Sequence, residues 1–133
     1  MKAIRIHKFG PTEEVLQYED VPVPEPKAGE ILIKVEAASL NRADLGLRKG
    51  TYRISADALP LIPGREFAGT IEKLGTGVNE YRAGQRVVAY PSLGGYPEYA
   101  VAKTSEVRPI PEQVTSAQAA ATPTVFLTAW FAL

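Results

Sequence analysis

The chain has 133 residues, enough for one domain with a hydrophobic core, and its 15 Lys and Arg residues balance 15 Asp and Glu residues. This balance provides no basic surface for nucleic acid or an anionic membrane, so neither is expected as a partner. The absence of cysteine excludes disulfides, thiolate zinc sites and a cysteine nucleophile. The apolar runs are too short for a membrane-spanning helix or a secretory signal, so we expect a cytoplasmic protein.

Residues 1–112 combine many glycines and prolines with short apolar runs, a pattern typical of many short strands. Alternating side chains predict a first strand around Ile4 and Ile6 and a second around Leu16 and Tyr18. The proline-rich segment 21–30 is predicted to be an extended connection that ends in a turn. Segment 31–40 predicts a half-buried strand, with Ile31, Ile33, Val35 and Ala37 on one face and Lys34 and Glu36 on the other.

A short helix is predicted after this strand, with Asn41 as its N-cap and Gly50 as its C-terminal stop. Turns and strands then return, with one strand near 68–74 and others in the segments AGQRVVAY and YPEYAVAKTSEVRPIP. These elements predict a mainly β fold for residues 1–112. We expect a small, partly open β-barrel with short helices, which buries one face of each strand.

Residues 113–133 are rich in alanine and other apolar residues and are predicted to form a helical segment. Thr115 or Ser116 can cap a first helix, and Pro123 suits the first turn of a second one. This second helix reaches Leu133 without a glycine cap, a polar turn or a basic last turn. We therefore expect it to continue into a further part of a longer protein.

Six motifs occur in order along nearly the whole chain: MKAIRIHKFG, PKAGEILIKVEAASLNRADLGLRKGTY, PLIPGREFAG, YRAGQRVVAY, GGYPEYAVA and LTAWFAL. In this order and spacing, the chain resembles the N-terminal, GroES-like catalytic portion of the medium-chain dehydrogenases/reductases. It is most similar to their zinc-free quinone oxidoreductase branch. The resemblance implies a GroES-like catalytic β-barrel domain over 1–112, and a segment 113–133 that leads towards a Rossmann cofactor domain.

The turn 64–78, GREFAGTIEKLGTGV, has the glycine and glutamate spacing of the family's zinc signature. The resemblance implies that the zinc enzymes carry His at position 65 and Cys at position 41, where this chain has Arg65 and Asn41. Arginine stays protonated and has no lone pair for a metal, and asparagine is a poor zinc ligand. We therefore predict no zinc site. The glycines of GTGV are predicted to form a turn, since no long helix follows them.

The resemblance implies hydride transfer from NADPH to a quinone or another conjugated carbonyl. A quinone delocalises the developing negative charge, so neutral hydrogen-bond donors can suffice without a metal ion. The protein's task is then to hold the acceptor on the nicotinamide. The strand, glycine-rich turn and helix of a cofactor-binding unit do not occur in this sequence. We therefore expect the 133-residue chain by itself to be inactive or nearly so.

Four residues are candidates for the site. The resemblance places Asn41 against the nicotinamide and the substrate, in addition to its role as a helix cap, and places Thr128 near the cofactor. Tyr52 can donate a hydrogen bond to the acceptor oxygen. Arg65 can supply fixed positive charge in the vacated metal space, although a simple ion pair with Glu66 is the alternative.

Other polar residues are assigned mainly structural roles. Asp44 is predicted to complete the helix cap. Tyr90 and Tyr96 are predicted to pack in the barrel, with a place in the acceptor pocket as the alternative. His7 is predicted to be a solvated side chain on an edge strand.

Two other functions remain open. An enoyl-thioester or enone reductase could use the same cleft, with Tyr52 as the proton donor. A standalone GroES-like binding module, such as a co-chaperone, is the alternative outside enzymology, although the sequence has no obvious mobile, apolar-tipped loop. A homodimer and the preference between NADPH and NADH also remain open.

Overall fold

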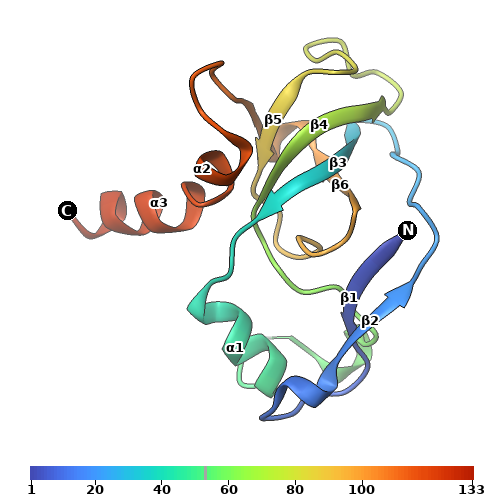
Figure 1. Cartoon of the computed structure of the whole chain (residues 1–133), viewed down its shortest axis with the longest axis vertical. Helices are drawn as coiled ribbons and strands as arrows, with labels where there is room; N and C mark the ends of the chain where they lie inside the picture. Colours follow the sequence, from blue (N-terminus) through green and yellow to red (C-terminus); the bar gives the residue numbers. More distant parts are fainter. Residues whose placement is uncertain (53) are drawn as a thin grey trace.

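The computed structural model describes residues 1–52 and 54–133, and an antiparallel five-stranded sheet forms its centre (Figure 1). The strand order is β6-β3-β4-β5-β7, so β6 and β7 are the edges of an open sheet. The mainly β prediction is confirmed, and the barrel is not closed. The strands are β3 (Glu30–Ala38), β4 (Phe67–Leu74), β5 (Arg86–Ala89), β6 (Tyr99–Lys103) and β7 (Val107–Pro109).

A separate two-stranded ribbon pairs β1 (Lys2–Ile6) with β2 (Leu16–Asp20), as the alternation predicted. The ribbon lies beside α1 (Arg42–Lys49), at the end of the molecule opposite the loop that joins β4 to β5 (Figure 1). A second apolar cluster fills the space there. It contains the buried residues Ile6, Val15, Leu47 and Leu61, with Phe9, Ile54, Leu59 and Leu93 packed against them.

Both faces of the sheet carry packed apolar residues, because helix α2 (Ser116–Ala120) covers part of the face that a half-buried strand would expose to water. Strand β4 contributes side chains to both faces of the sheet. Phe67 and Ile71 belong to the main core cluster, whereas Ala68 packs with Ala119 and Ala120 of α2. Side chains alternate across a strand, so this parity holds from Phe67 to Ile71. The pairing with β3 is irregular after Ile71, and Leu74 packs against the main core again.

The helix termini follow the predicted signals. Asn41 and Asp44 form a capping box at the start of α1, and Gly50 closes the helix with φ of 76°. Thr115 caps α2 by accepting a hydrogen bond from the backbone N–H of Gln118 at 3.2 Å. The third helix, α3 (Pro123–Ala132), begins with proline, which has no N–H to leave unpaired. Three short 3₁₀ helices, Glu13–Val15, Ala56–Ala58 and Thr104–Glu106, lie in the connections.

Helix α3 extends away from the body of the molecule and ends at the C-terminus (Figure 1). None of its described residues is buried, although nearly all of its side chains are apolar. Within residues 1–52 and 54–133, no helix has the length and apolar character needed to cross a lipid bilayer.

The GTGV segment is a turn, as predicted. Thr76 and Gly77 form the turn after β4, and Gly77 has φ of 81°. A Cβ atom on Gly75 would lie 1.8 Å from the backbone oxygen of Lys27, so only glycine fits where this turn contacts the connection before β3.

Candidate functional site

Asn41 lies where β3 gives way to α1, and its side chain turns towards the sheet. Its amide Nδ2 donates a hydrogen bond to Glu66 Oε1 at 2.7 Å and lies 3.4 Å from the hydroxyl of Ser39. Its backbone N–H donates to Asp44 Oδ2 at 2.7 Å. Asn41 therefore occupies the N-cap position, where Asp44 accepts its backbone N–H, while its side chain binds a buried carboxylate and is held in one orientation.

Glu66 is the only charged residue that is buried in the described part of the chain, with 1% of its surface exposed. It immediately precedes β4 and has the parity of Ala68, so its side chain lies on the helix-covered face of the sheet. Its carboxylate accepts hydrogen bonds from the Ser39 hydroxyl, the Asn41 amide and the backbone N–H of Thr124, the last at 2.7 Å.

These donors keep Glu66 ionised. Burial by itself raises the pKa of the Glu66 carboxyl, because it penalises the charged form. The hydrogen bonds from Asn41, Ser39 and Thr124 act in the opposite direction, and together they hold the pKa below its usual value. The site therefore contains a fixed negative charge beneath Asn41.

Arg65 points away from Glu66, and the predicted alternative of an ion pair between them is wrong. The described residues form four ion pairs, and neither Arg65 nor Glu66 belongs to any of them. Instead, the Arg65 guanidinium lies 5.7 Å from the ring centre of Tyr52 and 5.9 Å from that of Tyr90. Both distances are within the range of a cation–π contact.

The guanidinium also donates a hydrogen bond to the hydroxyl oxygen of Tyr52 at 3.3 Å. Because the Tyr52 oxygen accepts this bond, its own hydrogen remains available for another acceptor. Tyr52 and Tyr90 are exposed over 40% and 36% of their surfaces. Two of the predicted catalytic residues, Tyr52 and Arg65, thus form one accessible group. Tyr90 joins this group, so the prediction that it packs in the barrel is wrong.

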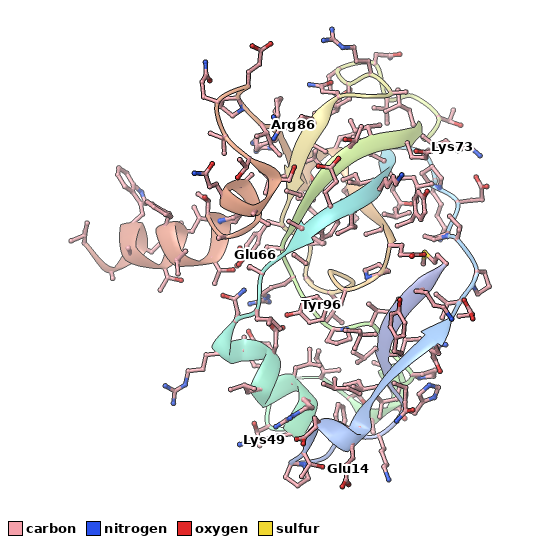
Figure 2. All side chains as sticks on the ribbon, in the orientation of Figure 1. Glu14, Lys49, Glu66, Lys73, Arg86 and Tyr96 are labelled. Atoms are coloured by element: carbon pink, nitrogen blue, oxygen red, sulfur yellow. The ribbon has the colours of Figure 1, made fainter. Side chains whose placement is uncertain are left out.

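Tyr96 has a structural role, as predicted. Its hydroxyl is bonded to Asp44 Oδ2 at 2.7 Å and lies 3.1 Å from the backbone oxygen of Ser39. Its ring lies against Gly64, where a Cβ atom would be 2.5 Å from Cε1 of Tyr96. Figure 2 shows Tyr96 beside the connection that leads from the sheet to α1.

Thr128 is exposed on α3, one helical turn after Thr124. The structure brings Asn41 to the start of this helix through Glu66, and Thr128 follows on the same side of α3. A cavity of about 370 Å³ separates α3 from the edge of the sheet. Its lining includes Tyr90 at the end of β5 and Leu127 beside Thr128.

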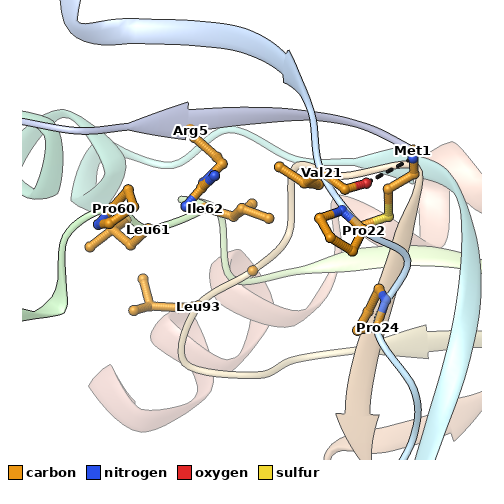
Figure 3. A pocket seen from close by; sticks show the side chains of 10 residues that line it. Met1, Arg5, Val21, Pro22, Pro24, Pro60, Leu61, Ile62 and Leu93 are labelled. Carbon is orange, nitrogen blue, oxygen red and sulfur yellow. Dashed lines mark hydrogen bonds between the residues drawn. The ribbon is translucent and has the colours of Figure 1, made fainter.

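A second cavity, of about 450 Å³, lies under the N-terminus (Figure 3). Prolines 22, 24 and 60 line it together with Arg5 and the side chain of Met1. The Met1 amino group donates a hydrogen bond to the backbone oxygen of Val21 at 2.9 Å, which joins two of the segments that line the cavity. None of the predicted site residues lines this cavity.

Metal ligands do not gather anywhere in residues 1–52 and 54–133. No group of three or more His, Asp or Glu side chains there could hold a metal ion. His7 is exposed, as predicted, and its Nε2 lies 3.1 Å from the Glu19 carboxylate across the β1–β2 ribbon.

Sequence reasoning missed the central position of Glu66. The signal was present in the parity of β4, because a glutamate two residues before Ala68 must share a face with it. The sequence did not reveal that helices would cover this face. That depends on residues 116–124, which are about 50 positions further along the chain.

Known proteins similar to this chain are alcohol dehydrogenase-like proteins and quinone oxidoreductases. The alcohol dehydrogenase GroES-like domain matches residues 27–112. The quinone oxidoreductase of Rattus norvegicus is 39% identical over 134 residues, which is all of this chain and 40% of that protein. The chloroplastic quinone-oxidoreductase homolog of Spinacia oleracea is 39% identical over 137 residues, covering the whole chain and 42% of the relative.

A solved structure extends this similarity to three dimensions. The Escherichia coli quinone oxidoreductase complexed with NADPH superposes with a TM-score of 0.93 at 32% identity, over all of this chain and 40% of that one. The chain thus spans about 40% of the length of the relatives that it matches.

Proposed function

Because the chain belongs to the alcohol dehydrogenase GroES-like domain family, we propose that it forms one wall of the active site of an NADPH-dependent quinone oxidoreductase. The whole protein would transfer hydride from the nicotinamide to a quinone or another conjugated carbonyl. The similarity to quinone oxidoreductases, one of them complexed with NADPH, supports this assignment. A cytoplasmic location belongs to the same proposal, although one relative is described as chloroplastic.

The observation that carries the proposal is the group formed by Arg65, Tyr52 and Tyr90. When an acceptor carbonyl is reduced, negative charge develops on its oxygen, and a donor placed there lowers the barrier. Tyr52 has a hydroxyl hydrogen free for that oxygen, while Arg65 donates to the same hydroxyl and supplies positive charge behind it. The exposed surfaces of Tyr52 and Tyr90 suit a planar conjugated acceptor.

NADPH, when bound, supplies the hydride. This chain offers it one wall only: the fixed side chain of Asn41 and the exposed hydroxyl of Thr128 further along α3. We propose that most of the contacts to NADPH are made outside residues 1–133. Titration of the isolated chain with NADPH should then give a dissociation constant for NADPH above about 1 mM. Tighter binding would contradict this division of the site.

The donor set supports a reaction without zinc. Arg65 and Asn41 are chemically poor replacements for the histidine and cysteine of the family's zinc enzymes. Glu66 could bind a cation, but its oxygens already accept hydrogen bonds from three donors. Metal analysis of the purified whole protein tests this part, and one zinc ion per chain would overturn it.

The function is tested with the whole protein and its variant Tyr52→Phe. Loss of a hydrogen bond to a developing charge should lower kcat/KM for a quinone about tenfold to hundredfold in Tyr52→Phe. The matched control is Tyr18→Phe, which removes a hydroxyl from an exposed tyrosine on β2 and should leave kcat/KM unchanged. An activity of Tyr52→Phe equal to that of the control would remove Tyr52 from the mechanism.

The enone or enoyl-thioester reductase alternative is favoured by the same free hydrogen on Tyr52, since reduction of a conjugated double bond requires a proton as well as a hydride. A panel of quinones, enones and enoyl thioesters distinguishes the two. The proposed function predicts the highest kcat/KM with a quinone.

A further inference from the structure

Glu66 joins three segments that are far apart in the sequence. Its Oε1 accepts hydrogen bonds from Ser39, after β3, and from Asn41, before α1. Its Oε2 accepts from the backbone N–H of Thr124, in the first turn of α3. Figure 2 shows Glu66 at the point where the chain leaves the sheet for α1, on the side from which α3 extends. All three donors are neutral groups.

The contact with Thr124 replaces a missing helix cap. The first N–H groups of any helix have no partner within the helix. Thr122, which occupies the N-cap position of α3, makes no side-chain capping hydrogen bond. Glu66 fills this role from another element, and its negative charge also suits the positive end of the helix dipole. None of the described residues of α3 is buried, so few other contacts fix its direction.

We infer that Glu66 is a positioning residue that holds Asn41 and α3 in one fixed arrangement, and so sets the spacing between the Asn41 side chain and Thr128. The structural part of this inference stands on the hydrogen bonds alone. Its catalytic consequence rests on the proposed function, in which Asn41 and Thr128 contact the cofactor.

The two carboxylate oxygens explain why an ionised side chain is needed here. The three groups bonded to Glu66 all donate a hydrogen to it, two to Oε1 and one to Oε2. In Glu66→Gln, one oxygen becomes an NH₂ group. This group must then face either the Asn41 amide or the Thr124 N–H, so one buried donor loses its acceptor. Glu66→Asp retains two acceptor oxygens and the charge, and should restore part of the arrangement.

Nuclear magnetic resonance of the isotope-labelled 133-residue chain tests the structural part. In Glu66→Gln, we expect amide exchange at Thr124 to accelerate about tenfold or more and the Asn41 side-chain amide signals to shift. Exchange in β3 and β4 should change less. In Glu66→Asp, both effects should be smaller. Glu98→Gln is the matched control, because Glu98 accepts a backbone N–H, that of Lys2 at 2.8 Å, far from α3 in the sequence.

Two results would overturn the inference. One is a Thr124 amide that exchanges as slowly in Glu66→Gln as in the control. The other is an equal loss of protection throughout the sheet and α3, which would show only a general loss of stability. If Glu66→Gln does not fold, Glu66→Asp decides. The inference then requires that the signals of Asn41 and Thr124 change together in this variant, and it fails if neither moves or only one does.

The catalytic consequence is measured separately in the whole protein. Glu66→Gln should raise KM for NADPH at least as much as it lowers kcat, and Glu66→Asp should recover part of the loss. A normal KM in Glu66→Gln, together with the expected resonance changes, would retain the structural role of Glu66 and reject the cofactor contacts of Asn41 and Thr128. The two parts can therefore fail independently.

Discussion

The hydroxyl of Tyr96 donates a hydrogen bond to Asp44 Oδ2 at 2.7 Å and so joins the loop before β6 to the first turn of α1. The same carboxylate oxygen accepts the backbone N–H of Asn41 at 2.7 Å. Burial raises the pKa of Tyr96 far above its usual value, and the hydrogen bond and charge of Asp44 add to this effect. Tyr96 therefore remains a donor throughout the physiological pH range and supports Asn41 from outside the site.

Replacing Tyr96 by phenylalanine should lower the free energy of unfolding by about 1.5–3 kcal/mol, because the lost bond has a charged acceptor. Tyr81→Phe is the comparison, since Tyr81 donates to a neutral acceptor, the backbone oxygen of Val107, at 2.8 Å. Its cost should be only about 0.5–1.5 kcal/mol. Urea denaturation of both variants measures the difference, and a larger loss in Tyr81→Phe would contradict the role given to Asp44.

Gly69 should tolerate no side chain. It lies in β4 opposite Val35, at an irregularity in the pairing with β3, and a Cβ atom there would be 1.9 Å from the backbone oxygen of Lys34. We expect Gly69→Ala to cost at least about 3 kcal/mol, because the two strands must separate. Gly46→Ala is the control. It lies inside α1 with no atom closer than 3.5 Å to the added methyl group, and should stabilise the chain by about 0.5–1 kcal/mol. Equal thermal stability of the two variants would refute this prediction.

Glu36 should make stability depend on pH. The Ser116 hydroxyl and the Thr70 hydroxyl each donate to its carboxylate at 2.6 Å, which connects α2 to the sheet. These bonds, the one from Ser116 foremost, lower the pKa of Glu36 from its usual 4.5 against the effect of partial burial. The nearby charges of Arg86 and Lys34 act in the same direction.

Because this pKa is lower in the folded than in the unfolded chain, the stabilisation is complete above the usual value and is lost as the pH falls through the folded value. The stability difference between the native chain and Glu36→Gln should therefore narrow below pH 4.5. Urea denaturation at a series of pH values measures it, with Glu72→Gln, an exposed position on β4, as the control. A difference that stays constant over this range would show that the two hydroxyl bonds contribute nothing.

The exposed apolar surface of α3 should make the isolated chain self-associate. Phe126, Trp130 and Phe131 are exposed over 68%, 73% and 83% of their surfaces. Contiguous apolar surface of this kind promotes association in water. Sedimentation should show an apparent mass that rises with concentration, and Phe126→Ser combined with Phe131→Ser should suppress the rise. Tyr18→Ser, which changes a residue 71% exposed on β2, should not. A chain that stays monomeric up to about 100 µM would contradict the prediction.

The local structure could be predicted from the sequence. Alternation located β1, β2 and β3, and Asn41, Gly50, Thr115 and Pro123 marked helix ends correctly. These signals are local, since each depends on backbone geometry or on side chains within a few positions. The absence of cysteine and the presence of Arg65 and Asn41 also limit the chemistry through residue type alone, whatever the fold around them.

Only the tertiary structure decided which groups Arg65 and Glu66 contact. Adjacent residues that enter a strand point to opposite sides, so Arg65 meets Tyr52 and Tyr90, while Glu66 enters the layer closed by the helices. That the two side chains diverge follows from their adjacent positions in the sequence. What each of them meets depends on residues 13 to 58 positions away, which come close only when the sheet and helices pack together.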